Sequence, residues 1–105
     1  MDRTLAALAD PHRRRVVEAL AEGPKRAGEL ADAVGLTPPA MSRHLRTLRQ
    51  AGLVEETHPE FDARVRIYTL RPEPMEYLKD WLARAERQWT AQLAAFKAHI
   101  ERDRG

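Results

Sequence analysis

Residues 27–52, AGELADAVGLTPPAMSRHLRTLRQAG, contain two apolar patterns with helical spacing on either side of a short turn. The first pattern covers residues 27–34 and stops at Gly35, a residue type that commonly follows the last turn of a helix. The second pattern follows Thr37, whose hydroxyl suits an N-cap, and ends at Gly52. This stretch therefore predicts two helices joined by a short turn that contains a glycine.

The second of these helices has two distinct faces. Met41, Leu45 and Leu48 recur at steps of three and four, which predicts a buried row. At about 100° per residue, the opposite and flanking positions are small or polar. They are Pro39, Ala40, Ser42, Arg43, Arg46, Thr47 and Gln50. Because residues 37–52 contain three arginines and no acid, this exposed face is predicted to be basic.

Two further helices are expected before this stretch. Residues 4–9 form a short amphipathic pattern with Leu5 and Leu8 on one side. Asp10 followed by Pro11 is a typical helix start, because aspartate can cap the helix and proline fits its first position. The helix that this pair opens is predicted to end at the next Gly-Pro pair.

After residue 52 the periodicity changes from helical to alternating. Residues 53–58 and 64–70 predict a two-stranded hairpin, with residues 59–63 as a five-residue loop. A long helix is expected over residues 75–102, where apolar side chains recur at steps of three and four. The stripe consists of Met75, Leu78, Leu82, Ala85, Trp89, Leu93, Phe96 and Ile100.

The composition favours a single globular domain spanning residues 1–105. Of these 105 residues, 43% are hydrophobic and 32% are charged, which is typical of a folded soluble protein. The chain has no cysteine, which excludes disulfides, thiolate nucleophiles and cysteine-ligated zinc. The apolar run near the amino end is too short for a signal peptide or a membrane span. A cytoplasmic protein without a membrane partner is therefore expected.

Two helices joined by a tight turn and followed by a basic hairpin are typical of a winged helix-turn-helix. This predicts a mostly α fold with a small β-hairpin, in which residues 4–72 form the core. Exposed arginines of the second helix can then pair with guanine, and hairpin arginines can contact phosphates. The predicted contacts to double-stranded DNA are Thr37, Pro39, Ala40, Ser42, Arg43, Arg46, Thr47, Arg64 and Arg66.

Four segments carry a resemblance to a known family: LADPHRRR at 8–15, GELA at 28–31, MSRHL at 41–45 and QAGLV at 50–54. They are similar to the corresponding parts of ArsR-type winged-helix repressors. The resemblance implies a homodimer that binds DNA and releases it in response to an effector, either a small molecule or a protein. It also implies that the first and last helices form the dimer interface. The interface residues expected on this basis are Leu5, Leu8, Leu78, Leu82, Ala85, Trp89, Leu93 and Phe96.

Two features differ from the metal-sensing members of that family. Their cysteine pairs lie in the helix that corresponds to residues 25–30, where this chain has no ligand pair. On the last helix Asp80 is followed by Leu82, where a ligand histidine would be needed. The resemblance therefore implies a branch without the metal-site cysteines, and neither a metal nor a cofactor is expected. The hairpin tip, residues 59–62, is acidic, so the hairpin arginines are expected to contact DNA in its place.

The remaining candidates are weaker. His99 and Asp103 have the spacing of half a metal site, but exposed pairs of this kind are usually solvated. His44 lies beside the buried row, which favours packing against the preceding helix over a contact with DNA, and His12 has no partner that the sequence identifies. No nucleophile–base pair supports an enzyme. The alternative is a winged-helix module that binds protein instead of DNA, although such a module has no need to exclude acids from residues 37–52.

Overall fold

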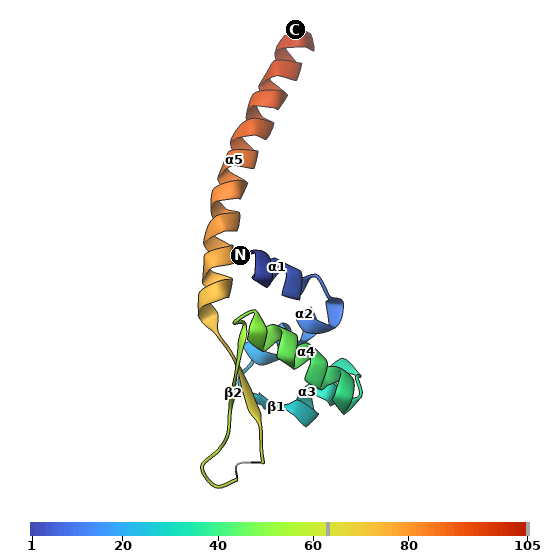
Figure 1. Ribbon diagram of the computed structural model, residues 1–105. Helices are drawn as coiled ribbons and strands as arrows, with labels where there is room; N and C mark the ends of the chain where they lie inside the picture. Colours follow the sequence, from blue (N-terminus) through green and yellow to red (C-terminus); the bar gives the residue numbers. More distant parts are fainter. Residues whose placement is uncertain (63, 105) are drawn as a thin grey trace. The chain divides into compact units, whose positions relative to one another are not determined.

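The computed structural model describes residues 1–62 and 64–104 (Figure 1). Its contacts divide the chain into two units, Met1–Met75 and Glu76–Gly105. The elements are α1 (Asp2–Leu8), α2 (Pro11–Ala21), β1 (Lys25–Arg26), α3 (Ala27–Val34), α4 (Pro38–Gln50), β2 (Val54–Thr57), β3 (Ile67–Leu70) and α5 (Pro72–Arg104). This order confirms the predicted winged helix-turn-helix, a mostly α fold with a small sheet and a long C-terminal helix.

The first unit is organised around one apolar core, to which α2, α3 and α4 all contribute. The largest fully buried side chains are Val16, Leu30, Met41, Leu45, Leu48 and Leu53. Burying each side chain of this size contributes about 1.5–3 kcal/mol relative to leaving it in water. The buried row predicted for α4 is confirmed, because Met41, Leu45 and Leu48 are at most 1% exposed.

The helix starts follow from side-chain caps that the sequence indicated. Oδ1 of Asp10 accepts the backbone N–H of His12 at 2.8 Å and that of Arg13 at 3.2 Å, which caps α2. Oγ1 of Thr37 accepts the backbone N–H of Ala40 at 3.4 Å and caps α4. Gly35 ends α3 with a φ of 78°, a left-handed conformation that residues with a Cβ rarely adopt.

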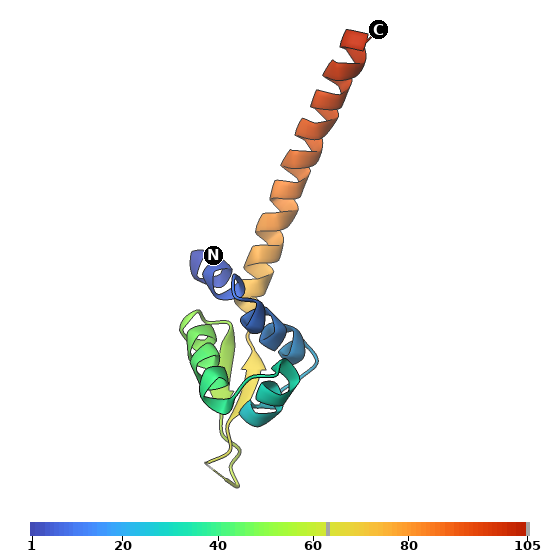
Figure 2. The same cartoon turned by 90° about the vertical axis from the view of Figure 1, so that its right-hand side faces the viewer.

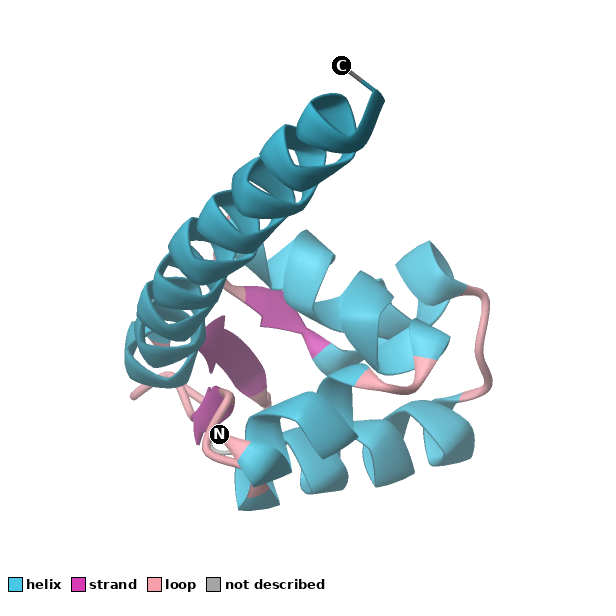
Figure 3. Ribbon diagram, turned by 90° about the horizontal axis from the view of Figure 1, so that it is seen from above, coloured by secondary structure: helices cyan, strands magenta, loops and turns pink. Residues whose placement is uncertain are grey.

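Among the described residues the sheet has three strands in the order β1-β3-β2, all antiparallel (Figure 3). The strand β1, residues Lys25–Arg26, was not predicted. It pairs with β3 through Lys25 opposite Tyr68 and Arg26 opposite Ile67. A two-residue strand is too short to show alternation, and the Gly-Pro pair before it is read from sequence only as a helix stop.

The predicted hairpin was correct in position but wrong in its boundaries. Strands β2 and β3 are four residues each, and the residues between them form a connection longer than five residues. Local turns compete with the ladder here: the backbone N–H of Asp62 donates to Pro59 O, and that of Val65 donates to Asp62 O. Arg64 and Arg66 therefore lie in the connection, before β3 begins. Ala63, part of the predicted loop, lies outside the described residues.

Helix α5 runs from Pro72 to Arg104 and begins three residues earlier than predicted. Proline is tolerated at both Pro72 and Pro74 because the first four backbone N–H groups of a helix have no intrahelical acceptor. Several large apolar side chains of α5 are exposed. They are Tyr77, Trp81, Leu82, Trp89, Leu93 and Phe96. No helix in the described part of the chain combines the length and apolar character that crossing a membrane requires.

Candidate nucleic-acid interface

Helix α4, green in Figure 2, lies at the edge of the first unit, and the arginine side chains of its basic face are exposed. Arg43 and Arg46 are exposed, on the side of the helix opposite the buried row. Among the residues that the structure describes, neither guanidinium has a carboxylate within ion-pair distance. These two cations therefore retain their full hydrogen-bonding capacity for an external ligand.

The turn before α4 fixes how this face is presented. The backbone N–H groups of Gly35 and Leu36 both donate to the carbonyl oxygen of Ala31 at 2.9 Å, which closes the end of α3. Leu36 packs against the core, and Thr37 then caps the next helix. The turn is hydrogen-bonded to α3, and the buried row of α4 packs in the core. The exposed face of α4 is therefore held in a fixed direction.

The other predicted contacts of α4 differ in how available they are. Pro39 and Ser42 are exposed, whereas Ala40 and Thr47 are half-buried. The hydroxyl of Thr47 donates to the carbonyl oxygen of Arg43 at 3.2 Å, so its proton is used within the helix. Thr47 can therefore meet an external ligand only as an acceptor.

The two arginines of the hairpin are less available than those of α4. Nε of Arg64 lies 3.4 Å from Oδ1 of Asp62, and its backbone N–H donates to the same oxygen at 2.9 Å. The Arg64 side chain is nevertheless 94% exposed, so this pair is easily exchanged for another anion. Nε of Arg66 lies 3.5 Å from Oε1 of Glu56, a carboxylate that is only 10% exposed.

Glu56 is the centre of an ion-pair cluster that the sequence did not reveal. Its Oε2 lies 2.6 Å from Nη1 of Arg49, and its Oε1 lies 3.5 Å from Nε2 of His58 as well as near Arg66. The cluster therefore joins the end of α4 to both sides of the hairpin. Glu56 also stands opposite Tyr68 in the ladder. Burial raises the pKa of the Tyr68 phenol, and the negative charge of Glu56 adds to that shift.

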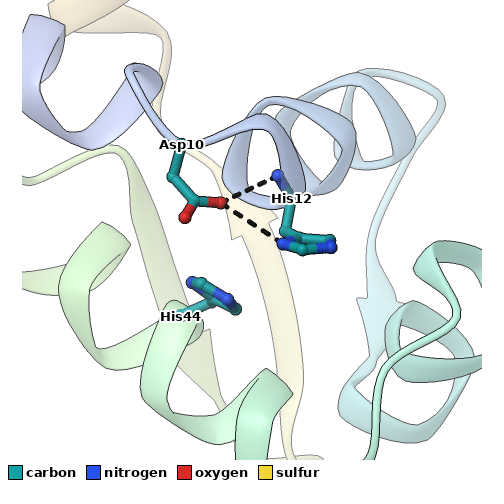
Figure 4. Close-up of side chains that lie close together, drawn as sticks. All are labelled: Asp10, His12 and His44. Carbon is teal, nitrogen blue, oxygen red and sulfur yellow. Dashed lines mark hydrogen bonds and ion pairs between the residues drawn. The ribbon is translucent and has the colours of Figure 1, made fainter.

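His44 was expected to pack against the preceding helix, and in the structure its ring faces the start of α2. Its ring centroid lies 5.6 Å from that of His12, with the ring planes 37° apart. The α2 cap places Asp10 beside both rings (Figure 4). Desolvation alone would raise the pKa of Asp10, but the N–H groups of Arg13 and His12, with the positive charges nearby, leave that pKa lowered. The contact was missed because His44 follows His12 by 32 residues and lies on a different helix.

Comparison with known proteins assigns a family to this geometry. Residues 10–56 match the profile of the bacterial regulatory protein, arsR family. Over 100 residues the chain is 40% identical to the HTH-type transcriptional regulator Rv2034 of Mycobacterium tuberculosis, covering 95% of this chain and 88% of that protein. The chain belongs to the ArsR family. It is a DNA-binding transcriptional regulator with a winged helix-turn-helix fold.

Two further proteins extend the comparison of this ArsR regulator. The transcriptional repressor SdpR of Bacillus subtilis is 32% identical over 56 residues, which are 53% of this chain and 62% of that protein. The solved structure of an ArsR-like transcriptional regulator from Rhodococcus sp. RHA1 superimposes with a TM-score of 0.77 at 26% identity. It covers 95% of this chain and 89% of that one, so the similarity includes the long C-terminal helix.

The residues expected at the dimer interface of this ArsR regulator differ in exposure. On α1, Leu5 is 45% exposed, whereas Leu8 is partly buried against the core of the first unit. On α5 the exposed members of the stripe are Leu82, Trp89, Leu93 and Phe96, at 45%, 52%, 67% and 62%. Leu78 and Ala85 are each only 8% exposed in the single chain.

Proposed function

We propose that this ArsR regulator is a homodimeric, sequence-specific repressor that reads a pseudo-palindromic operator. The observation that carries the proposal is the exposed basic face of α4, in which Arg43 and Arg46 have no carboxylate partner among the described residues. A helix that only needed solubility would carry acids as well, and residues 37–52 carry none. The two arginines are therefore suited to a ligand that is rich in acceptors.

We infer that α4 enters the major groove, where base edges differ in their donors and acceptors. Arg43 and Arg46 would each offer two parallel donors to a guanine, which is the commonest specific contact of arginine with DNA. Pro39 and Ala40 would lie against thymine methyl groups. Thr37, Ser42 and Thr47 would contact bases or phosphates, Thr47 as an acceptor only.

The hairpin would contribute affinity more than sequence preference. Arg64 is almost fully exposed, and a DNA phosphate would replace Asp62 as its partner. Arg66 would have to share its charge with Glu56, so its contribution is expected to be the smaller of the two. The acidic tip residues Glu60 and Asp62 disfavour deep insertion of the hairpin beside phosphates.

We infer that α5, together with α1, forms the dimer interface. Trp89, Leu93 and Phe96 are more than half exposed in the single chain, and such a row of large apolar side chains favours association. Two-fold symmetry would then present two copies of α4 to half-sites about one helical turn apart, or a multiple of it. A dimer bound across a promoter would exclude polymerase, and the similarity to SdpR, named as a repressor, supports this direction of regulation.

The sensing mechanism of this regulator does not use cysteine, because the chain has none. We infer that an effector of another kind, a small molecule or a partner protein, changes the affinity of the dimer for DNA. Nothing in the family assignment requires a membrane partner or an enzymatic step.

Selection of bound DNA from a random pool tests the proposed function. We expect enrichment of a motif with two-fold symmetry, and sedimentation of the unbound protein at micromolar concentration as a dimer. Enrichment of an asymmetric motif would contradict the dimeric reading, and failure to enrich any motif would favour the module that binds protein instead of DNA. Sedimentation as a monomer only would contradict the interface assigned to α5.

A further inference from the structure

Three potential metal ligands meet where the start of α2 approaches α4. A carboxylate oxygen of Asp10 and ring nitrogens of His12 and His44 all lie within 4.8 Å of one another (Figure 4). All three side chains are half-buried, so they are held in place and still accessible to an ion from solvent. They belong to the first unit, and none of them is among the residues proposed to contact DNA.

The hydrogen bonds of Asp10 leave part of its carboxylate available. Oδ1 accepts the N–H groups of His12 and Arg13 and lies 3.6 Å from Nδ1 of His12. Within the described residues no hydrogen bond is made to Oδ2. One oxygen can therefore keep the helix cap while the other coordinates a cation.

Three arginines, Arg13, Arg14 and Arg15, follow His12 in α2, and their positive charge could oppose a cation. The guanidinium groups of the first two, however, are bonded to carbonyl oxygens at the end of α1. Nε of Arg13 donates to Ala7 O at 2.7 Å, and Nη1 of Arg14 donates to Leu8 O at 2.8 Å. These bonds hold Arg13 and Arg14 at the end of α1, and the exposed Arg15 makes no hydrogen bond or ion pair with the three ligands among the described residues.

The distances in the cluster are close to those of a metal site. With bonds of about 2.0–2.2 Å, tetrahedral zinc holds neighbouring ligand atoms about 3.4 Å apart. The ligand atoms of Asp10, His12 and His44 lie within 4.8 Å of one another, so they would have to approach by at most about 1.4 Å to reach that spacing. Two imidazoles and one carboxylate suit zinc and related transition metals, whereas calcium and magnesium prefer oxygen ligands alone.

We propose that Asp10, His12 and His44 form a binding site for a divalent transition metal of the zinc class, with water completing the coordination. A metal at this site bridges the start of α2 to α4 next to Arg43, so its binding restrains the helix that carries the exposed arginines. The site is distinct from the regions, residues 25–30 and the last helix, where metal-sensing relatives were expected to hold ligands.

Calorimetric titration of the metal-free, untagged chain with Zn²⁺ at neutral pH, without DNA, tests the site directly. We expect one ion to bind per chain. In a separate thermal-unfolding measurement, we expect zinc to raise the midpoint temperature of unfolding and a chelator to reverse that rise. His12→Ala removes a ligand but keeps the cap, which uses the backbone N–H groups of residues 12 and 13, and we expect it to weaken zinc binding at least about tenfold. His44→Ala should have the same effect.

His99→Ala is the matched control, because His99 forms an exposed pair with Asp103, Nε2 to Oδ2, at 3.4 Å. We expect this variant to bind zinc like the original chain. Equal binding by the original chain and His12→Ala, or no binding up to millimolar zinc, would overturn the proposal. Since no DNA is present, either result leaves the proposed repressor function untouched.

Discussion

Neutralising Glu56 should loosen the junction between α4 and the hairpin while leaving the core intact. Glu56→Gln preserves the size and shape of the side chain, so no cavity forms, but it removes the charge shared by Arg49, Arg66 and His58. The Glu56 side chain is 10% exposed and its Oε2 lies 2.6 Å from Nη1 of Arg49. This makes Glu56 the most enclosed carboxylate among the ion pairs of the described residues.

The magnitude follows from the distances and the exposure of the partners. Unit charges about 3.5 Å apart attract by about 5 kcal/mol at an effective dielectric constant of about 20. Desolvation of Glu56 and the ordering of long side chains oppose this attraction. Because the partner side chains are 51%, 45% and 62% exposed, water screens them considerably. We therefore expect Glu56→Gln to lower the free energy of unfolding by about 1–2 kcal/mol.

Urea denaturation at one fixed protein concentration measures this change. Glu55→Gln is the matched control, since Glu55 is the exposed neighbour on the same strand and makes no ion pair among the described residues. We expect the control to change stability by less than about 0.5 kcal/mol. A double-mutant cycle with Arg49→Gln should give a coupling energy of at least about 0.5 kcal/mol. Equal effects of the two glutamate substitutions, or no coupling to Arg49, would refute the reasoning.

Three further predictions concern the core, the α2 cap and the hairpin. Leu48→Ala, at a residue that is 0% exposed, should lower the free energy of unfolding by about 2–5 kcal/mol in the same urea assay. Asp10→Ala should cost about 1 kcal/mol at neutral pH, measured against the original chain. Because the pKa of Asp10 is lowered on folding, that difference should persist above about pH 4 and vanish as the pH falls through the folded-state value. Arg64→Ala should weaken binding to all DNA sequences alike and reduce the slope of log affinity against log salt by about one, as measured by fluorescence anisotropy; an altered sequence preference would contradict the phosphate role.

Local signals in the sequence were sufficient for the helices of the first unit. Three predicted features follow from residues close together in the sequence, and the structure contains all of them. They are the cap at Thr37, the left-handed Gly35 and the buried row of Met41, Leu45 and Leu48. These features depend on spacing within one helix or one turn. They can therefore be predicted without knowing which residues pack against them.

The features that sequence reasoning missed depend on contacts between distant residues. Strand β1 exists only because Lys25 and Arg26 find β3 more than 40 residues later. The Glu56 cluster requires the end of α4 to meet both sides of the hairpin, and no local pattern specifies that meeting. Likewise, the position of His44 beside the buried row indicated packing against the preceding helix and did not indicate the contact with His12 of α2.

At the hairpin, a local side-chain hydrogen bond shortens the strand that the alternating pattern predicts. The alternation from Arg64 onward predicts a strand, yet the carboxylate of Asp62 captures the backbone N–H of Arg64 at 2.9 Å. An aspartate that bonds its own backbone two residues later favours a turn over a ladder. The strand therefore starts at Ile67, and the arginines expected at its first positions are presented by the connection.

The central claim is that α4 reads DNA sequence through its exposed arginines. The most direct test compares the affinities of the original chain and Arg43→Ala for a selected operator and for a scrambled duplex at one salt concentration. Loss of a bidentate contact to a base should cost about 1–3 kcal/mol, so we predict a fall of about 5- to 150-fold for the operator. The affinity of Arg43→Ala for the scrambled duplex should change much less. If Arg43→Ala keeps both the affinity and the preference of the original chain, α4 is not the reading element.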